Sequence, residues 1–216
     1  MNVHRWNKLS QTPVFPDSFT EEMTSTFEAA ATGNRNAQAA VGSLYLQGNG
    51  VPANTSEAIR WFEKSAKGGS ASAAMTLARL YLRGEYVDKD YEVAISWYET
   101  AASSGDAKAM YRLGGIYAKG KIVAKDQNLA VFWFRKAAEA RDAAAQLVFA
   151  IILRDGKGIE ANWGDALKWL ERALDGDLSE ENRAVALKAK RSIKQNIFNS
   201  VSKSPNIDPA ENETAA

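Results

Sequence analysis

The sequence predicts an all-α protein made of repeated helix pairs, and three observations support this. Apolar side chains recur at steps of three and four residues, which is the period of a helix that buries one face. Bulky and small residues return every 36 residues without an insertion. Glycines return at the same interval, where each first helix is expected to stop. The positions that keep the interval are Trp61, Trp97, Trp133 and Trp169; Ala58, Ala94, Ala130 and Ala166; and Gly48, Gly84, Gly120 and Gly156.

Composition narrows the function classes before any motif is considered. The 216 residues include 27 basic and 26 acidic side chains, for a formal net charge of +1. The chain has no cysteine and one histidine, which removes disulfides, thiolate nucleophiles and cysteine-ligated metal sites. The near-zero net charge argues against a dedicated polyanion binder. We therefore expect a binding module rather than an enzyme, with no cofactor and no metal.

The first residues and the hydropathy pattern bear on location. Pro13 and Pro16 interrupt the N-terminal segment, which lacks the apolar stretch of a secretory signal. No run of about 18 apolar residues could span a bilayer. The expected location is cytoplasmic, without membrane insertion.

The third unit shows how each pair is expected to form. The segment 107–117 places its apolar residues on one stripe, and Gly120 then ends that helix. After a short loop, Asp126 is a natural N-cap, because its side-chain oxygen can accept from an unpaired amide of the next helix. The second helix carries an apolar face around Trp133. The equivalent N-cap positions in the other units are Asn54, Asp90 and Asn162.

These residues resemble a known repeat. The pattern that carries the resemblance is Asp106 to Tyr117, followed by Gly120, Val123, Asp126, Ala130, Trp133-Phe134 and Lys136-Ala137-Ala138. It is similar to the Sel1-like repeat, a relative of the tetratricopeptide repeat, and the similarity covers about Asn36 to Asp177. The resemblance implies a right-handed α/α solenoid whose first helices line a concave face. It also implies work as an adaptor or scaffold for other proteins.

The ends of the chain depart from the repeat and are expected to cap it, since a solenoid needs polar outer faces. The fourth unit is degenerate, with Leu153 for the tyrosine of the other units and Arg141-Asp142 for the Gly105-Asp106 turn. The expected segments are an N-terminal tail (1–17), an N-terminal capping helix (18–35), four repeats (about 36–71, 72–107, 108–143 and 144–178), a C-terminal capping helix (179–198) and a disordered tail (199–216).

Partner binding is expected at first-helix positions that vary between units, because the repeated residues are best explained as core. The family geometry points to one surface, which joins cations to apolar anchors and consists of Met75, Arg79, Arg83, Lys108, Tyr111, Lys119, Leu147, Ile151 and Arg154. Such a surface suits an acidic peptide or a C-terminal carboxylate, since arginine can grip a carboxylate with two parallel hydrogen bonds. The competing interpretation is that these charges only keep a helix face soluble.

Two tryptophans lie off the period. Trp163 begins the last repeat helix and is expected either to pack on the C-terminal cap or to anchor a partner. Trp6 lies in the N-terminal segment, which could fold back over the first unit or present a short motif.

Two other function classes are weaker. Nucleic-acid binding could use the basic last helix, which holds Arg183, Lys188, Lys190, Arg191 and Lys194, although a phosphate-binding surface should show stronger charge asymmetry. An enzyme or regulatory subunit is the third class. The segment 155–158 lacks the spacing of a phosphate-cradling loop, and no nucleophile–base pair can be assembled.

Overall fold

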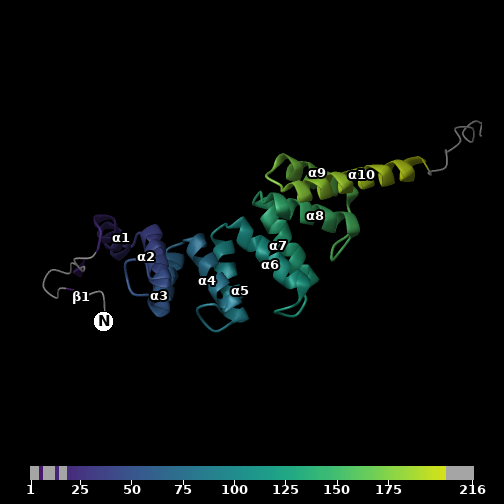
Figure 1. The fold of residues 1–216 in the computed structure, drawn as a ribbon. Helices are drawn as coiled ribbons and strands as arrows, with labels where there is room; N and C mark the ends of the chain where they lie inside the picture. The colour runs from purple at the N-terminus through teal and green to yellow at the C-terminus, as the bar shows by residue number, and fades with distance from the viewer. Residues whose placement is uncertain (1–4, 7–12, 15–18, 203–216) are drawn as a thin grey trace, which may run out of the picture. The chain divides into compact units, whose positions relative to one another are not determined.

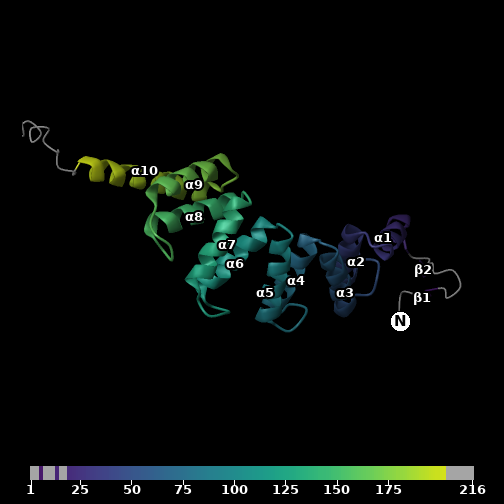
Figure 2. The ribbon, with the colours of Figure 1, turned by 180° about the vertical axis from the view of Figure 1, so that it is seen from behind.

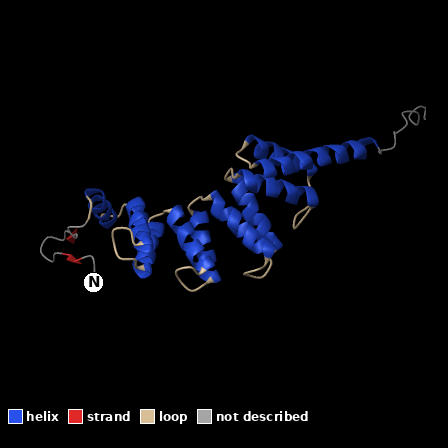
Figure 3. Cartoon of the chain, viewed as in Figure 1, coloured by secondary structure: helices blue, strands red, loops and turns tan. Residues whose placement is uncertain are grey.

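A computed structural model describes residues 5–6, 13–14 and 19–202 of the protein (Figure 1). The chain divides into two compact units, Met1–Ala140 (unit 1) and Arg141–Ala216 (unit 2). The predicted all-α class is confirmed, because helices form most of the described chain and loops join them (Figure 3). The only described strands, β1 (Arg5–Trp6) and β2 (Pro13–Val14), are two residues long and pair antiparallel. The predicted C-terminal tail from residue 203 onward lies outside the described residues.

Unit 1 consists of one capping helix and three helix pairs. Helix α1 (Glu21–Ala31) begins after Thr20, whose hydroxyl accepts from the amide of Met23 at 3.2 Å. The pairs follow one another along the unit and appear in the same order from both sides (Figures 1 and 2). They are α2 (Arg35–Gln47) with α3 (Thr55–Lys67), α4 (Ala71–Arg83) with α5 (Tyr91–Ser103), and α6 (Ala107–Lys119) with α7 (Gln127–Glu139).

Unit 2 holds the fourth pair, α8 (Ala143–Asp155) and α9 (Trp163–Asp175), followed by the long helix α10 (Glu180–Ser202). Helix α10 packs against both α8 and α9. It continues four residues past the predicted end at Phe198, so residues 199–202 are helical where the sequence predicted a tail. Ser200 and Ser202 donate their hydroxyls to carbonyls of the preceding turn, at 2.7 and 2.9 Å, and so remain compatible with the helix.

The loop inside each pair begins and ends in the same way in all four repeats, although Gly50 and Gly158 add a second left-handed residue in the first and fourth. The first helix ends on a left-handed glycine, at Gly48, Gly84, Gly120 and Gly156, which confirms the predicted stops. The side chains of Asn54, Asp90, Asp126 and Asn162 accept from amides of the second helix at 2.9–3.1 Å, so the predicted N-caps are also confirmed.

The same cap residues also bind back to the first helix. The amide of Asn54 donates to the carbonyl of Tyr45 at 2.8 Å. The amides of Asp90 and Asp126 do the same to Tyr81 and Tyr117 at 3.1 Å. The fourth repeat keeps the bond from Asn162 to Leu153 at 2.8 Å, so its degenerate sequence leaves the loop unchanged.

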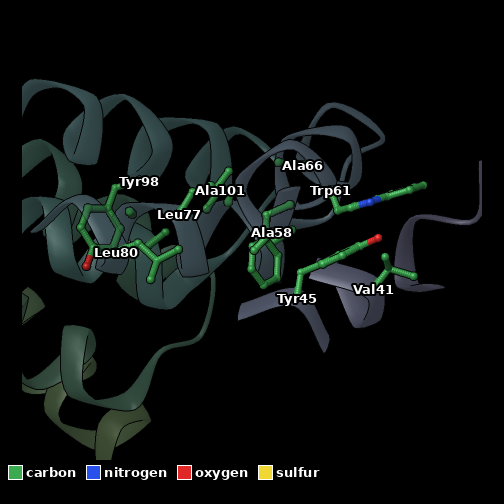
Figure 4. Packing of buried hydrophobic residues seen from close by; sticks show 14 of the residues in the cluster. Val41, Tyr45, Ala58, Trp61, Ala66, Leu77, Leu80, Tyr98 and Ala101 are labelled. Carbon is green, nitrogen blue, oxygen red and sulfur yellow. The ribbon is translucent and has the colours of Figure 1, made fainter. Parts of the chain in front are cut away.

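Inside a pair, a ring of the second helix packs on the backbone of the first. A Cβ atom added at Gly114 would lie 2.8–2.9 Å from the ring of Phe134, and one at Gly42 would lie 3.0 Å from the ring of Phe62. Gly42 and Gly114 therefore allow the two helices to approach closely in the first and third repeats. Figure 4 shows the buried side chains around Tyr45, Trp61 and Leu77 in unit 1.

The repeated tryptophans are less buried than a pure core role would require. Trp61 is buried, whereas Trp97, Trp133 and Trp169 are half-buried. Cationic side chains lie over two of the rings, since Lys64 Nζ is 4.2 Å from the centroid of Trp61 and Arg172 Cζ is 4.6 Å from that of Trp169. Trp61 and Trp169 thus pack within the fold and also carry a cation–π contact.

The first prediction concerns the close approach at Gly114. Gly114→Ala should lower the free energy of unfolding by about 1–3 kcal/mol, because the new methyl group overlaps the Phe134 ring. Gly115→Ala is the matched control on the same helix: nothing lies within 4 Å of its added Cβ, so better helix propensity should raise stability by about 0.5–1 kcal/mol. Denaturant unfolding of both variants measures this, and equal effects would contradict the packing account.

The second prediction concerns Arg141, the only residue other than glycine with a positive φ (65°) in the described chain. It stands in register with Gly33, Gly69 and Gly105, which have positive φ angles too. A side chain in this left-handed conformation costs about 1–2 kcal/mol, partly offset by the entropy that glycine loses on folding. Arg141→Gly should therefore raise the melting temperature slightly, whereas the control Ala140→Gly, at φ −78°, should not. A lower melting temperature for Arg141→Gly would refute this.

Candidate partner-binding surface

The predicted surface residues of unit 1 lie on two first helices. Met75, Arg79 and Arg83 follow one another at four-residue steps on α4, and therefore share one stripe. Lys108, Tyr111 and Lys119 lie on α6. The four cations are exposed, and the two apolar anchors, Met75 and Tyr111, are half-buried.

The cations of this surface are only weakly engaged within the protein. Arg79 Nη2 donates to Thr76 Oγ1 at 3.4 Å, and Arg83 Nη1 lies 3.5 Å from Glu85 Oε1. Both separations are at the long end for hydrogen bonds, and an exposed pair of this kind contributes little to stability. Within the described chain, neither Lys108 nor Lys119 has a carboxylate within 4 Å. These side chains remain available to a ligand.

The apolar anchors are held by packing. The Tyr111 ring meets the Phe134 ring edge-on, with 5.6 Å between the centroids, so α7 fixes one face of the tyrosine. Met75 packs against the buried cluster of unit 1. Both side chains are thus positioned on the surface rather than loose on it.

The structure adds two residues that the sequence interpretation missed. Tyr98 on α5 is only 2% exposed, and burial raises the pKa of its phenol. The guanidinium groups of Arg112, Arg79 and Arg83 act in the opposite direction on this pKa. Arg112, on α6, therefore acts on the pKa of the same phenol as the two predicted arginines. A sequence signal existed at Tyr98: it stands where the other units have Phe62, Phe134 and Leu170.

The predicted surface residues of unit 2 differ in kind. Leu147 is only 3% exposed and belongs to the core, because α8 packs against both α9 and α10 in this unit. It is therefore not available to a partner, contrary to the expectation for its register. Ile151 is half-buried. Arg154 is held by a hydrogen-bonded ion pair, with 2.6 Å between its Nε and Asp155 Oδ1.

Trp163 and the basic helix α10 also have structural contacts. The indole of Trp163 donates to the carbonyl of Arg154 at 3.2 Å, so it binds the end of α8. Arg183 donates to the carbonyls of Leu174 and Gly176 at 2.9 and 3.3 Å. Lys190 forms an ion pair with Glu171 at 2.9 Å. Two of the five cations considered for nucleic-acid binding thus stabilise unit 2.

The described residues also bear on metal binding and on membrane insertion. The described residues include no group of three or more histidine, aspartate or glutamate side chains that could hold a metal ion. Among the described helices, none combines the length and the hydropathy needed to cross a bilayer.

The fold and its loop define a class of protein built from consecutive helix-turn-helix repeats. A family model described as Sel1 repeat matches residues 35–70, 71–106, 107–142 and 143–178. The chain therefore belongs to the Sel1 repeat family. Proteins of this family generally mediate protein–protein interactions, and the fold is typically non-catalytic.

A solved structure agrees with this assignment. A Sel1 repeat protein from Oxalobacter formigenes is 30% identical, with a TM-score of 0.63 over 81% of this chain and 78% of that chain. A putative Sel1 repeat protein from Klebsiella pneumoniae is 25% identical, with a TM-score of 0.44 over 80% of this chain and 83% of that one. The cysteine rich protein B of Helicobacter pylori is 23% identical, with a TM-score of 0.47 over 60% and 92% of the two chains. None of the curated proteins matches the chain.

The third prediction concerns the ion pair of Asp155. Hydrogen bonds from Arg154 and from Lys157 (2.9 Å) lower the pKa of Asp155 to about 2, against an ordinary 3.8. A carboxylate with a lowered pKa in the folded state stabilises the protein above about pH 4, and this contribution disappears as the pH falls toward about 2. Because the side chains are partly exposed, solvent screening limits the contribution to about 1 kcal/mol or less.

Asp155→Asn should therefore be less stable than wild type at neutral pH and equally stable near pH 2. Chemical denaturation across this range measures the difference. The control Asp175→Asn removes an exposed carboxylate with no ion pair in the described chain, so its difference from wild type should not follow the same profile. A constant difference for Asp155→Asn at all pH values would refute the prediction.

Proposed function

We propose that the protein is a non-catalytic adaptor, and that unit 1 binds an acidic segment of a partner protein along the first-helix surface of α4 and α6. The observation that carries this proposal is the pair Arg79 and Arg83. They lie one turn apart, are exposed, and have only long contacts to Thr76 and Glu85. A guanidinium in this state can exchange a weak contact for a charge-assisted hydrogen bond with a carboxylate.

The neighbouring anchors supply the rest of the binding energy in this proposal. Met75 and Tyr111 are half-buried and offer apolar contact area beside the charges. Apolar area beside cations suits an extended peptide that carries alternating acidic and apolar side chains. Lys108 and Lys119 extend the positive region along α6 and would raise the rate of encounter with an acidic partner.

The proposed surface is confined to unit 1. In unit 2, Leu147 is in the core and Arg154 already binds Asp155, so neither supports partner binding there. Nucleic acid is the less supported ligand, because Arg183 and Lys190 are held by Leu174, Gly176 and Glu171. A cytoplasmic location remains part of the proposal, based on the sequence alone.

The fourth prediction tests the surface by charge reversal. Arg79→Glu with Arg83→Glu should weaken binding of a labelled peptide that alternates glutamate and leucine by about tenfold or more, because two charge-assisted contacts become repulsive. Fluorescence anisotropy at physiological salt measures the dissociation constant. Affinity capture from native lysate then shows which proteins the variant loses.

A matched control lies on α3. Arg60 and Lys67 are exposed cations seven residues apart, paired with Glu57 and Glu63 of the same helix. Arg60→Glu with Lys67→Glu changes the net charge by the same amount and should leave peptide binding within about twofold, since long-range charge effects are screened. The adaptor surface is wrong if the α4 variant binds the peptide as well as wild type does.

A further inference from the structure

The last helix of unit 2 is longer than its packing within the unit. Helix α10 has 23 residues, whereas α8 and α9 have 13 each. Its buried residues are Ala186, Ala189 and Ile193, and Ile197 is half-buried. The other described side chains after Ile193 are exposed, and this part of α10 extends past α8 and α9 in both views (Figures 1 and 2). A short helical segment is marginal in water without packing, so a further contact would stabilise the end of α10.

Two large apolar side chains of α10 are exposed on the same side of the helix. Leu187 is 52% exposed and Phe198 is 67% exposed. They are eleven residues apart in the sequence, which is about three helical turns, so they lie in line about 16 Å apart along the axis. Neither belongs to the stripe from Ala186 to Ile193 that packs inside unit 2. Both are therefore open to another molecule.

Two cations lie between these apolar side chains. Leu187, Arg191, Lys194 and Phe198 follow one another at steps of four, three and four residues, and we name these four residues the α10 stripe. The same steps separate the seam residues of two helices that pack along each other. Arg191 and Lys194 are exposed, and in the described chain no carboxylate lies within 4 Å of either. The α10 stripe thus has the spacing of a helix seam and unpaired positive charge at its centre.

This charge argues against a second copy of the chain as the occupant. In an antiparallel pair of α10 helices, with Leu187 of each copy opposite Phe198 of the other, Arg191 would face Lys194. In a parallel pair, each cation would face its own copy. Residues 182–202 include five basic side chains and no acidic one, so α10 offers no carboxylate to relieve either arrangement. Like charges at such a seam are unfavourable.

A bilayer surface and a nucleic acid fit the α10 stripe less well. A helix that lies in a membrane surface separates its apolar face from its charged face, whereas here the cations lie between the apolar residues. A phosphate backbone would pair with Arg191 and Lys194, but it would leave Leu187 and Phe198 without an apolar contact. An occupant is needed that offers apolar groups at both ends and negative charge between them.

We propose that the α10 stripe docks an acidic amphipathic helix of a partner protein. Apolar side chains of that helix cover Leu187 and Phe198, and glutamate or aspartate side chains between them pair with Arg191 and Lys194. Apolar side chains buried in such a contact supply most of its energy, and charge pairs between helices select the partner and its orientation. The α10 stripe includes none of the α4 and α6 residues of the proposed peptide surface, so this inference goes beyond the proposed function and does not rest on it.

The fifth prediction uses a fluorescein-labelled helical peptide that presents leucine, glutamate, glutamate and leucine at steps of four, three and four residues. Fluorescence anisotropy should show saturable binding to the wild-type chain. Arg191→Glu with Lys194→Glu should weaken binding by about tenfold or more, because two attractive contacts become repulsive. Phe198→Ala should weaken it by about fivefold to tenfold through the lost apolar contact. All three residues are exposed, so circular dichroism should show wild-type helix content in both variants.

A charge-swapped peptide separates recognition from any structural effect of the substitutions. The peptide with lysine in place of both glutamates should bind Arg191→Glu with Lys194→Glu more tightly than it binds wild type, and a damaged helix would not show this rescue. The matched control is Arg60→Glu with Lys67→Glu on α3, which changes the net charge equally and should keep the affinity for the acidic peptide within about twofold.

The α4 variant keeps the two proposals apart. Arg79→Glu with Arg83→Glu should bind the helical peptide as wild type does, even where it loses the extended glutamate–leucine peptide. If the helical peptide binds wild type and the α10 variant equally, or does not bind wild type, the α10 stripe is not a docking site, whatever the extended peptide does.

Three further outcomes would assign the α10 stripe to another occupant and overturn the proposal. One is a wild-type dimer in sedimentation equilibrium that Phe198→Ala abolishes. Another is binding through Arg191 and Lys194 that is tighter to phosphatidylserine–phosphatidylcholine vesicles or to duplex DNA than to the helical peptide. The third concerns the acidic residues after α10: if Asp208→Asn with Glu211→Gln and Glu213→Gln raises the peptide affinity by about tenfold, a segment of this chain occupies the stripe.

Discussion

The structure depends on one residue in each repeat that links its two helices by hydrogen bonds. In the first repeat this residue is Asn54. Its side chain accepts from an amide of the second helix, and its own amide donates to the carbonyl of Tyr45 in the first helix. The left-handed glycine before it turns the chain so that both bonds can form. Because the glycine stop, the cap and this hydrogen bond recur in four repeats, each first helix has the same register relative to its second helix. A surface made of first-helix residues is a consequence of that repetition.

The period made most of the fold predictable. Caps, stops and close helix approaches are local, and their residue types follow from hydrogen bonding and from space. The structure departs from the prediction where contacts distant in the sequence determine the conformation. The half exposure of Trp97 and Trp169 reflects their place at the rim of the packing. The extra turn of α10 contains serines whose hydroxyls bond to carbonyls of the same helix and so are compatible with it. Arg141 shows that the chain keeps the left-handed turn even where the glycine is lost.

The candidate site was less predictable, because a register does not reveal what packs on it. Met75 and Leu147 occupy the same position of the repeat, yet Leu147 lies in the core of a unit that has an additional helix, α10. Arg112 lies outside the predicted surface, and only the packing of α5 against both α4 and α6 relates it to Tyr98. The sequence shows Tyr98 at a position where the other repeats have apolar residues. The arginines that act on its pKa are known only from the structure.

These exceptions indicate where a repeat protein carries its specificity. Positions that every repeat shares are constrained by the loop and by the core, so a substitution there lowers stability. A position that varies between repeats without a change in packing is free of that constraint. Tyr98 is such a residue, because two other repeats have phenylalanine there. An exposed guanidinium that has no carboxylate within 4 Å in the described chain, such as that of Arg112, can bind an external anion. The net charge of +1 does not reveal such a site, because a sum over the whole chain contains no information about where the arginines lie.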